Sequence, residues 1–255
     1  MTASADLAPI ALAAGAGFIG GTMNALAGGG TFATLPALLA LGLPANIANA
    51  TSNAALMPGA ATSAWAMRDE LQPLGGVSIR TLAAIMAVAG FAGSVLLVLT
   101  PSRAFDLIIP WLLLYAFIVL AWGKNAAAWL RARVSIGPRT LMTTQGLLGI
   151  YGGYFGGGVG LMMMATYGLL VGHSPREMFA PRTLMLATAN AAAAIVFVST
   201  GMIAWAACVP MLIGSIIGGW IGAHVGKRLP HGAVRVWTLL VTGATTLVFF
   251  WRAYH

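Results

Sequence analysis

Apolar residues fall in long runs along this chain, and glycine, proline or basic residues separate one run from the next. Most runs are about twenty residues long, which is the length that an α-helix needs to cross a bilayer core of ~30 Å. They lack the short alternation of apolar and polar residues that a transmembrane β-barrel requires. The pattern therefore predicts an all-α polytopic protein embedded in a lipid bilayer.

The first part of the chain, residues 1–123, opens with two apolar arms joined by Gly28-Gly29-Gly30. Three successive glycines weaken a helix, and the arm that follows them, residues 31–43, is too short to cross a bilayer. We therefore expect a re-entrant helical hairpin over residues 8–43. Three transmembrane helices should follow it, at about 47–67, 82–99 and 105–122.

A basic connector at residues 124–140 separates this part from the next. It contains the helix breaker Gly137-Pro138 and four basic residues, Lys124, Arg131, Arg133 and Arg139. Glycine and proline in such a polar segment indicate a boundary between two halves of the chain.

The second part, residues 141–255, repeats the plan of the first. A hairpin is expected at 141–171 with Gly156-Gly157-Gly158 at its tip, followed by helices at about 178–199, 203–225 and 234–252. In this alignment Pro44 corresponds to Pro175, and Pro101 to Pro230. The order of these breakers indicates an internal repeat, although glycine-rich apolar helices also resemble one another by composition alone.

The distribution of positive charge predicts the topology. The chain has 13 Lys and Arg against 5 Asp and Glu, a net charge of +8. If each hairpin enters and leaves the membrane on one face, only Arg103 and Arg252 lie on the opposite side from the other basic residues, and the positive-inside rule favours this arrangement. The shared inner side then holds Arg68, Arg80, Lys124, Arg131, Arg133, Arg139, Arg176, Arg182, Lys227, Arg228 and Arg235.

This topology predicts periplasmic termini and three crossings in each half. Because three is an odd number, the second half is inverted relative to the first, as in many secondary transporters. The basic surplus is explained by topology, so no nucleic-acid partner is expected.

The composition disfavours an enzyme. Hydrophobic residues make up 59% of the chain and charged residues 7%, which excludes an ordinary soluble enzyme. The sequence has no paired nucleophile and base and no His, Asp and Glu cluster with metal-ligand spacing, so we expect no catalytic residue, metal or cofactor. The five acidic residues lie at or beyond the ends of apolar runs, which disfavours a cation pump.

The arms after the glycine tips point instead to an anion. Each arm begins at membrane depth, where its N-terminus offers N–H groups and the positive end of the helix dipole. Polar side chains accumulate after each hairpin and add hydrogen-bond donors, although Asn, Ser and Thr also bind neighbouring helices. The candidate substrate-binding residues are Gly28, Gly29, Gly30, Thr31, Asn49, Ser52, Asn53, Gly156, Gly157, Gly158, Arg182 and Thr183.

Arg182 has two interpretations of about equal weight. It lies in about the second turn of the helix after Pro175 and aligns with Thr51 of the first half. Its guanidinium can extend to the inner membrane surface as a topology anchor, or turn inward to pair with a bound oxyanion.

The chain resembles the sulfite exporter TauE/SafE family of membrane permeases over nearly its whole length. The matching features are the glycine-rich opening 17–30, the segment Leu41-Gly42-Leu43-Pro44 with 48–53 after it, the second copy at 149–183, and a glycine-rich helix ending near Leu229-Pro230 with Arg235 beyond. Pro181-Arg182 departs from the small residues of the family pattern and leaves the exact substrate open.

The resemblance implies a secondary transporter that exports sulfite or organosulfonate-type anions across the bacterial inner membrane, with proton coupling commonly proposed. Alternating access around an anion near the midplane is the expected mechanism. A channel-like conductor and a carrier of another small organic anion are the alternatives. The partners are then a small sulfur-containing anion and the bilayer. A homo-oligomer is also compatible with the sequence.

Overall fold

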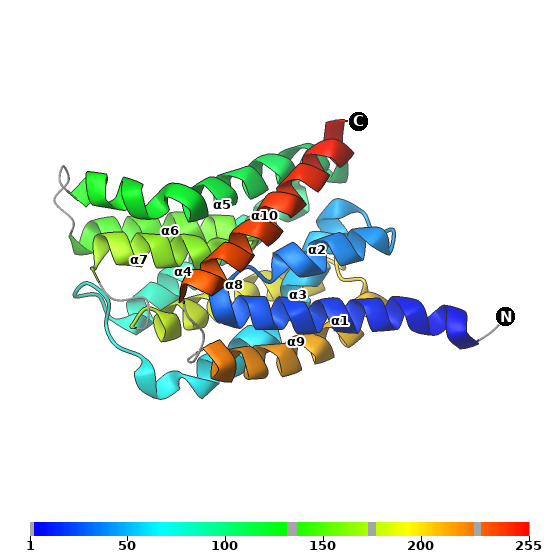
Figure 1. Cartoon of the computed structure of the whole chain (residues 1–255), viewed down its shortest axis with the longest axis horizontal. Coiled ribbons are helices and arrows are strands. Elements are labelled where there is room, and N and C mark those ends of the chain that lie inside the picture. The colour runs from blue at the N-terminus through cyan, green and yellow to red at the C-terminus, as the bar shows by residue number, and fades with distance from the viewer. Residues whose placement is uncertain (1–2, 132–136, 173–176, 227–230, 255) are drawn as a thin grey trace.

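The structure is a computed structural model that describes residues 3–131, 137–172, 177–226 and 231–254 (Figure 1). Within these ranges every regular element is helical, which confirms the all-α prediction. The α-helices are α1 (Ala3–Ala27), α2 (Thr31–Ala40), α3 (Ala45–Ala66), α4 (Ile79–Leu99), α5 (Ser102–Arg131), α6 (Pro138–Tyr154), α7 (Val159–Leu170), α8 (Phe179–Ser199), α9 (Trp205–Gly226) and α10 (His231–Tyr254), and a short 3-10 helix (Arg68–Glu70) follows α3.

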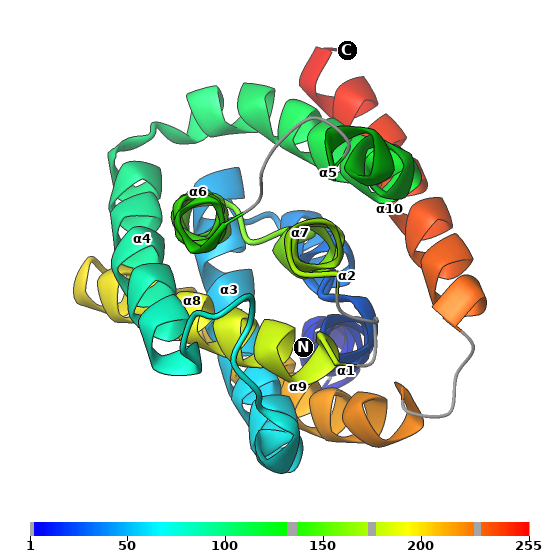
Figure 2. The same ribbon diagram turned by 90° about the vertical axis from the view of Figure 1, so that its left-hand side faces the viewer.

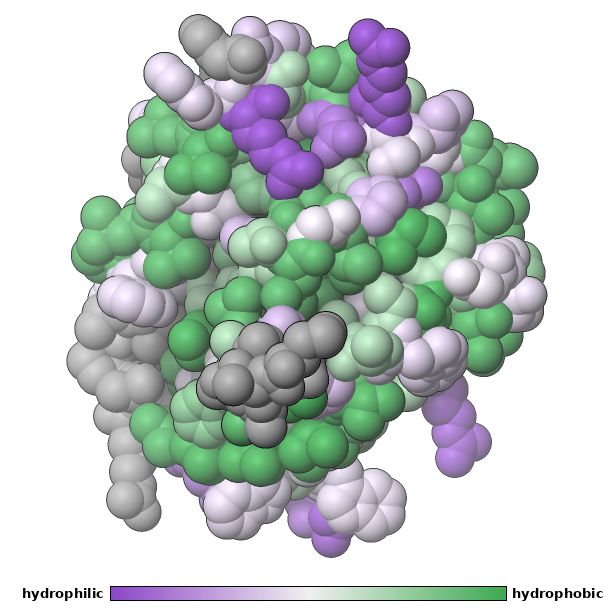
Figure 3. Space-filling view, turned by 90° about the vertical axis from the view of Figure 1, so that its right-hand side faces the viewer, coloured by the Kyte–Doolittle hydropathy of each residue, from purple (hydrophilic) through white to green (hydrophobic). Residues whose placement is uncertain are grey.

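Six of the described helices contain a stretch long and apolar enough to cross a membrane. Large apolar side chains of these helices are exposed on the protein surface: Val88, Leu99 and Leu247 are each 73% exposed. Apolar residues also cover much of the face shown in Figure 3. Such a surface is stable in lipid, and the chain is a multi-pass membrane protein. The six stretches are Leu7–Ala27, Ile79–Leu99, Ser102–Trp122, Phe179–Ser199, Trp205–Val225 and Val236–Tyr254.

The helix limits differ from the expected ones mainly in the basic connector. α5 continues to Arg131, beyond the expected end at Trp122, and α6 already begins at Pro138. The apolar run stops near Trp122, but the alanine-rich segment after it has high helix propensity, so the helix outlasts the apolar run. Several residues used in the repeat and topology arguments lie outside the described residues: Arg133, Pro175, Arg176, Lys227, Arg228 and Pro230.

When α1–α5 are matched in order with α6–α10, a contact between two helices from different halves recurs between their two counterparts. α1 packs along α9, and its counterpart α6 packs along α4. α3 contacts α9, and its counterpart α8 contacts α4. The counterparts α3 and α8 contact each other, and so do α5 and α10. Figure 2 shows α6 and α7 end-on near the centre, surrounded by α4, α5, α8, α9 and α10.

Helical glycines allow the closest of these contacts. A Cβ atom on Gly21 of α1 would overlap the carbonyl oxygen of Ser215 in α9. In the matched pair, a Cβ atom on Gly153 of α6 would overlap the carbonyl oxygen of Gly90 in α4. Small residues at such crossings let two helix backbones approach in a membrane. Part of the glycine repeat therefore serves helix packing.

Candidate functional site: the meeting point of two helical hairpins

The tips of the two hairpins touch through their backbones. Gly28, in the turn between α1 and α2, has φ +77° and faces Gly160 in the first turn of α7. A Cβ atom added to Gly28 would overlap the Cα of Gly160, and one added to Gly160 would lie 2.6 Å from the Cα of Gly28. The N-terminal ends of α2 and α7 are therefore brought together.

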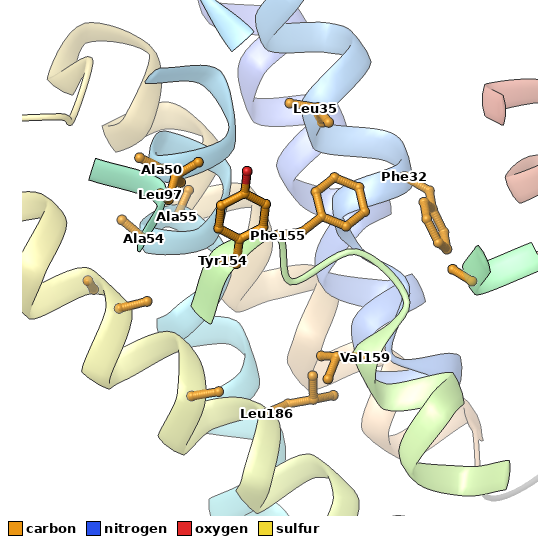
Figure 4. Close-up of a cluster of buried hydrophobic side chains, with 14 of the residues drawn as sticks. Phe32, Leu35, Ala50, Ala54, Ala55, Leu97, Tyr154, Phe155, Val159 and Leu186 are labelled. Atoms are coloured by element: carbon orange, nitrogen blue, oxygen red, sulfur yellow. The ribbon is translucent and has the colours of Figure 1, made fainter. Parts of the chain in front are cut away.

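Aromatic and aliphatic side chains enclose this contact. Tyr154 and Phe155, at the end of α6, both pack edge-on against Phe105 of α5, with ring centroids 5.5 Å and 6.4 Å apart. Figure 4 shows Phe155 between Tyr154 and Phe32, with Val159 and Leu186 on the other side of the turn after α6. The polar groups of the site therefore lie in an apolar surrounding, where hydrogen bonds and charges act strongly.

Two asparagines of α3 bind the carboxyl end of α6. Asn49 Nδ2 donates to the carbonyl oxygen of Tyr154 at 3.0 Å, and Asn53 Nδ2 donates to that of Gly152 at 3.5 Å. Asn49 is 0% and Asn53 3% exposed, and the Oδ1 atoms of both have no hydrogen-bond partner. These side chains join the first half of the chain to the second and leave two buried acceptors unused.

Gly156 occupies a narrow space between the two halves. Its φ of +75° favours glycine, and an added Cβ atom would lie 3.2 Å from Asn53 Nδ2, 3.3 Å from the Gly152 carbonyl oxygen and 3.9 Å from Thr31 Oγ1. Thr31 is the first residue of α2. The structure thus brings together three predicted site residues: Thr31 of α2, Asn53 of α3 and Gly156 in the turn between α6 and α7.

The first hairpin is also fixed by residues that were not predicted. Asn24 Oδ1 accepts a hydrogen bond from the Gly30 backbone N–H at 3.2 Å. Thr34 Oγ1 donates to the Gly30 carbonyl oxygen at 3.2 Å and lies 2.5 Å from Ser52 Oγ. Ser52 therefore takes part in helix-to-helix bonding. Asn24 and Thr34 could have been found as polar residues within about one turn of the glycine tip.

Gly29, Gly157 and Gly158 lie against aromatic rings. A Cβ atom added to Gly29 would lie 3.0 Å from the Phe32 ring, and one added to Gly157 would lie 2.5 Å from the Phe155 ring. A Cβ atom on Gly158 would also lie 3.0 Å from Phe32. These glycines keep the aromatic side chains close to the turn.

Arg182 is fully buried, which excludes its interpretation as an anchor at the membrane surface. Its Nη2 donates to the carbonyl oxygen of Ala25 at 2.5 Å, and its Nη1 to that of Leu26 at 3.3 Å. Nη2 also lies 3.4 Å from Thr183 Oγ1, and the guanidinium carbon lies 4.4 Å from the centre of the Phe179 ring. The guanidinium thus covers the negative carboxyl end of α1, while its Nε has no hydrogen-bond partner.

The groups near the hairpin tips that can bind a ligand are neutral polar groups and the guanidinium of Arg182. In the part of the chain that the structure describes, no three His, Cys, Asp or Glu side chains gather where they could hold a metal ion. Backbone N–H groups, amides and hydroxyls can recognise a small polar ligand.

The sequence comparisons agree with this architecture. The family model for the sulfite exporter TauE/SafE matches residues 13–249. A protein named probable membrane transporter protein from Haemophilus influenzae is 28% identical over 89% of this chain and 90% of its own length. A similarly named protein from a Sinorhizobium species, ORF9, is 30% identical over 89% of this chain and 85% of its own length.

A third relative, the probable membrane transporter protein YfcA of Escherichia coli K12, is 26% identical over 83% of this chain and 77% of its own length. No solved structure matches the chain. The family match covers nearly all of the helical core, from α1 to α10, and therefore includes both hairpins. The chain belongs to the sulfite exporter TauE/SafE family of membrane transporters.

Proposed function

We propose that this protein is a secondary transporter that exports sulfite or organosulfonate-type anions across the bacterial inner membrane by alternating access. The anion is held near the membrane midplane between the two glycine-tipped hairpins. The observation that carries this proposal is the Gly28–Gly160 contact, because it brings the N-terminal ends of α2 and α7 together. Two positive helix ends at one point favour a negatively charged ligand.

Arg182 adds a fixed positive charge beside the first hairpin. Its guanidinium binds the carbonyl oxygens of Ala25 and Leu26 in the last turn of α1, and its Nε has no hydrogen-bond partner. No carboxylate partner of Arg182 is present among the described residues. The carbonyl and hydroxyl partners of the guanidinium are neutral groups, so its net charge can still attract an anion in an apolar surrounding, which supports this hairpin as part of the binding site.

Burial of the site supports a carrier over a channel. Among the candidate side chains, Thr31 is 6% exposed and Asn49, Ser52, Asn53, Arg182 and Thr183 are each 3% exposed or less. These side chains, all within the described residues, are almost inaccessible to solvent, so the helices must move to admit a ligand to them and to release it. The recurrence of contacts between the two halves supports a rocking motion of one half against the other.

The proposed location of both termini on one side of the membrane is supported by the positions of the chain ends. The beginning of α1 and the end of α10 lie at the same end of the molecule (Figure 1). Arg103 and Arg252, the two basic residues assigned to the outer side, line one pocket of about 290 Å³ together with Asp106. Their proximity agrees with a shared side of the membrane.

The membrane potential can supply the driving force for export. With a negative interior, an anion gains about 2.3 kcal/mol per charge at 100 mV when it moves outward. Strict proton coupling is not required by these energetics.

Counterflow in proteoliposomes tests the proposal. Vesicles are loaded with unlabelled sulfite, sulfoacetate, taurine, sulfate or a carboxylate, and uptake of labelled sulfite is followed. We expect saturable accumulation of label only with a sulfur oxyanion inside. Flux without saturation or counterflow would identify a channel-like conductor. No uptake of labelled sulfite under any loading, together with counterflow of a labelled carboxylate, would identify a carrier of another organic anion.

A further inference from the structure

Two hollows lie on the surface where α5 and α10 pack together (Figure 1). The first, the arginine pocket of about 290 Å³, is lined by Arg103 and Asp106 near the start of α5 and by Arg252 in the last turn of α10. The second, the aromatic groove of about 480 Å³, is lined by Trp111, Leu247, Phe250, Trp251 and Tyr254. Because α5 and α10 come from different halves of the chain, both hollows lie between the halves.

Tyr254 links the arginine pocket to the aromatic groove. Its side chain lines the groove, and its hydroxyl donates to the carbonyl oxygen of Leu107 at 3.4 Å. Leu107 itself lines the arginine pocket. Phe249 and Phe250 are consecutive residues of α10, and each lines one of the two hollows. The pocket and the groove are therefore adjacent parts of one surface.

The depth of these residues matches the layers of a membrane leaflet. The apolar stretches of the two helices are Ser102–Trp122 and Val236–Tyr254, so Arg103 and Arg252 lie at the ends of these stretches, where lipid head groups are found. Trp111 lies about 12 Å further along α5, at ~1.5 Å of rise per residue. The arginine pocket thus lies at the level of the head groups, and the aromatic groove extends to the level of the acyl chains.

The aromatic side chains of the groove hold one another in place. Trp111 Nε1 donates to the hydroxyl oxygen of Tyr254 at 2.9 Å, so both rings use their polar groups inside the protein. Phe250 packs edge-on against Trp111 and stacks on Tyr254, with ring centroids 5.3 Å and 6.0 Å apart. Trp and Tyr at a membrane interface commonly direct these polar groups to head groups or water. Here the exposed parts of Trp111 and Tyr254 form an apolar wall, which suits a hydrocarbon chain.

The arginine pocket has two positive charges and one negative charge available for a ligand. Arg103 and Arg252 are exposed and Asp106 is partly buried. Within the described residues, none of these three side chains forms a hydrogen bond or an ion pair. A guanidinium binds a phosphate through its planar fork of N–H groups, and a carboxylate binds a primary ammonium. The charges therefore fit a ligand that carries a phosphate and an amine side by side.

From these observations we propose that α5 and α10 together bind one molecule of phosphatidylethanolamine. Its phosphodiester pairs with Arg103 and Arg252, its ammonium pairs with Asp106, and one acyl chain lies in the aromatic groove. An anionic phospholipid without an amine places its phosphate near the Asp106 carboxylate without compensation. A choline head group has no N–H group to donate to that carboxylate. The bound lipid joins the two halves of the chain at this end of the molecule, and its site is separate from the hairpin tips.

Native mass spectrometry of the delipidated full-length protein in detergent tests the site. The protein is titrated with phosphatidylethanolamine, phosphatidylglycerol or phosphatidylcholine of the same acyl composition. We expect one molecule of phosphatidylethanolamine to bind at least tenfold more tightly than either of the other lipids, and to raise the melting temperature saturably. Equal affinity for the three lipids would show an unselective lipid shell and would overturn the site.

Two further readouts of this titration concern the occupant of the groove. Glycerophosphoethanolamine has the same head group without acyl chains, and we expect it to bind at least tenfold more weakly than the lipid. Equal binding of the two compounds would exclude the groove from the site. A protein dimer that forms in place of the lipid complex would show that a second copy covers the groove, and would also overturn the proposal.

Asp106→Asn tests the contact with the amine. The change removes the partner of the ammonium and the repulsion of an anionic lipid, while it retains the size of the side chain. We expect the preference for phosphatidylethanolamine over phosphatidylglycerol to fall at least fivefold. An unchanged preference would overturn the assignment of the head group.

The double variant Arg103→Gln, Arg252→Gln tests the contact with the phosphate. It should weaken phosphatidylethanolamine binding about tenfold. Arg68→Gln is the matched control and should bind normally, because Arg68 is also exposed and lies beside an acidic residue and an indole ring, Asp69 and Trp65, but lines neither hollow. The same loss in both proteins would mean that any surface arginine attracts the lipid, against a defined site.

Leu247→Trp tests the groove, because a larger side chain at this position takes the space of the acyl chain. We expect it to weaken phosphatidylethanolamine binding about fivefold. Val248→Trp provides the comparison, since Val248 is the next residue of α10 and is also exposed, but does not line the groove. Unchanged binding in Leu247→Trp would contradict the placement of the acyl chain.

Discussion

The guanidinium of Arg182, at the start of α8, donates to the carbonyl oxygen of Ala25 at 2.5 Å, at the end of α1. This hydrogen bond joins residues 157 positions apart in the sequence and connects the second half of the chain to the tip of the first hairpin. The buried Arg182 thus anchors the hairpin as well as supplying positive charge beside it.

Arg182→Ala should destabilise the folded protein by about 2–3 kcal/mol, because it leaves two carbonyl groups of α1 without their charged donor. Arg182→Lys should lose less, since lysine retains the charge but not the planar fork. Thermal unfolding in detergent measures both variants. Because the side chain is fully buried, a wild-type melting temperature in Arg182→Ala would refute the anchoring role.

Gly28→Ala should reduce transport by about tenfold or more, which corresponds to ~1.4 kcal/mol in a binding equilibrium. The added methyl group would meet the Gly160 backbone and separate the two hairpin tips. Gly42→Ala is the matched control, because Gly42 also has a positive φ, +83°, but has nothing within 4 Å of its Cβ position. Initial rates in proteoliposomes should distinguish the two variants. Equal losses would mean that backbone strain, and not contact between the tips, limits transport.

Gly153→Ala should impair assembly of the helix bundle, because its methyl group would overlap the Gly90 carbonyl oxygen in α4. Gly15→Ala in α1 provides the comparison, since nothing lies within 4 Å of its Cβ position. Size-exclusion chromatography and melting temperature after extraction in mild detergent report the effect. A monodisperse Gly153→Ala protein with unchanged stability would contradict the tight α4–α6 packing.

The proposed topology predicts which positions a membrane-impermeant thiol reagent reaches in intact cells. In a Cys208→Ser background, Arg103→Cys should be labelled from outside, and Arg68→Cys only after the membrane is permeabilised. Both arginines are exposed, and native Cys208 is only 1% exposed, so its removal should disturb little. Labelling of both positions in intact cells would exclude the assignment of Arg68 to the inner side.

Several features of this protein could be predicted from the sequence because they depend on local properties. The length of the apolar runs determines that the elements are membrane helices, and the glycine triplets at 28–30 and 156–158 determine where the hairpins break. The end of α5 was missed because the end of an apolar run marks where hydrophobicity ceases, while helix propensity continues to Arg131.

The partners of the polar groups were decided only by the tertiary structure. The sequence predicted Asn49, Asn53 and Arg182 as candidate site residues on the helices after the hairpins, but it could not show that the amides bind α6 carbonyls or that the guanidinium covers the end of α1. Those contacts join positions about a hundred or more residues apart, and they form only when the two halves pack together. Helix formation follows from the local chain, whereas the direction of a buried hydrogen bond depends on which distant backbone group packs against it.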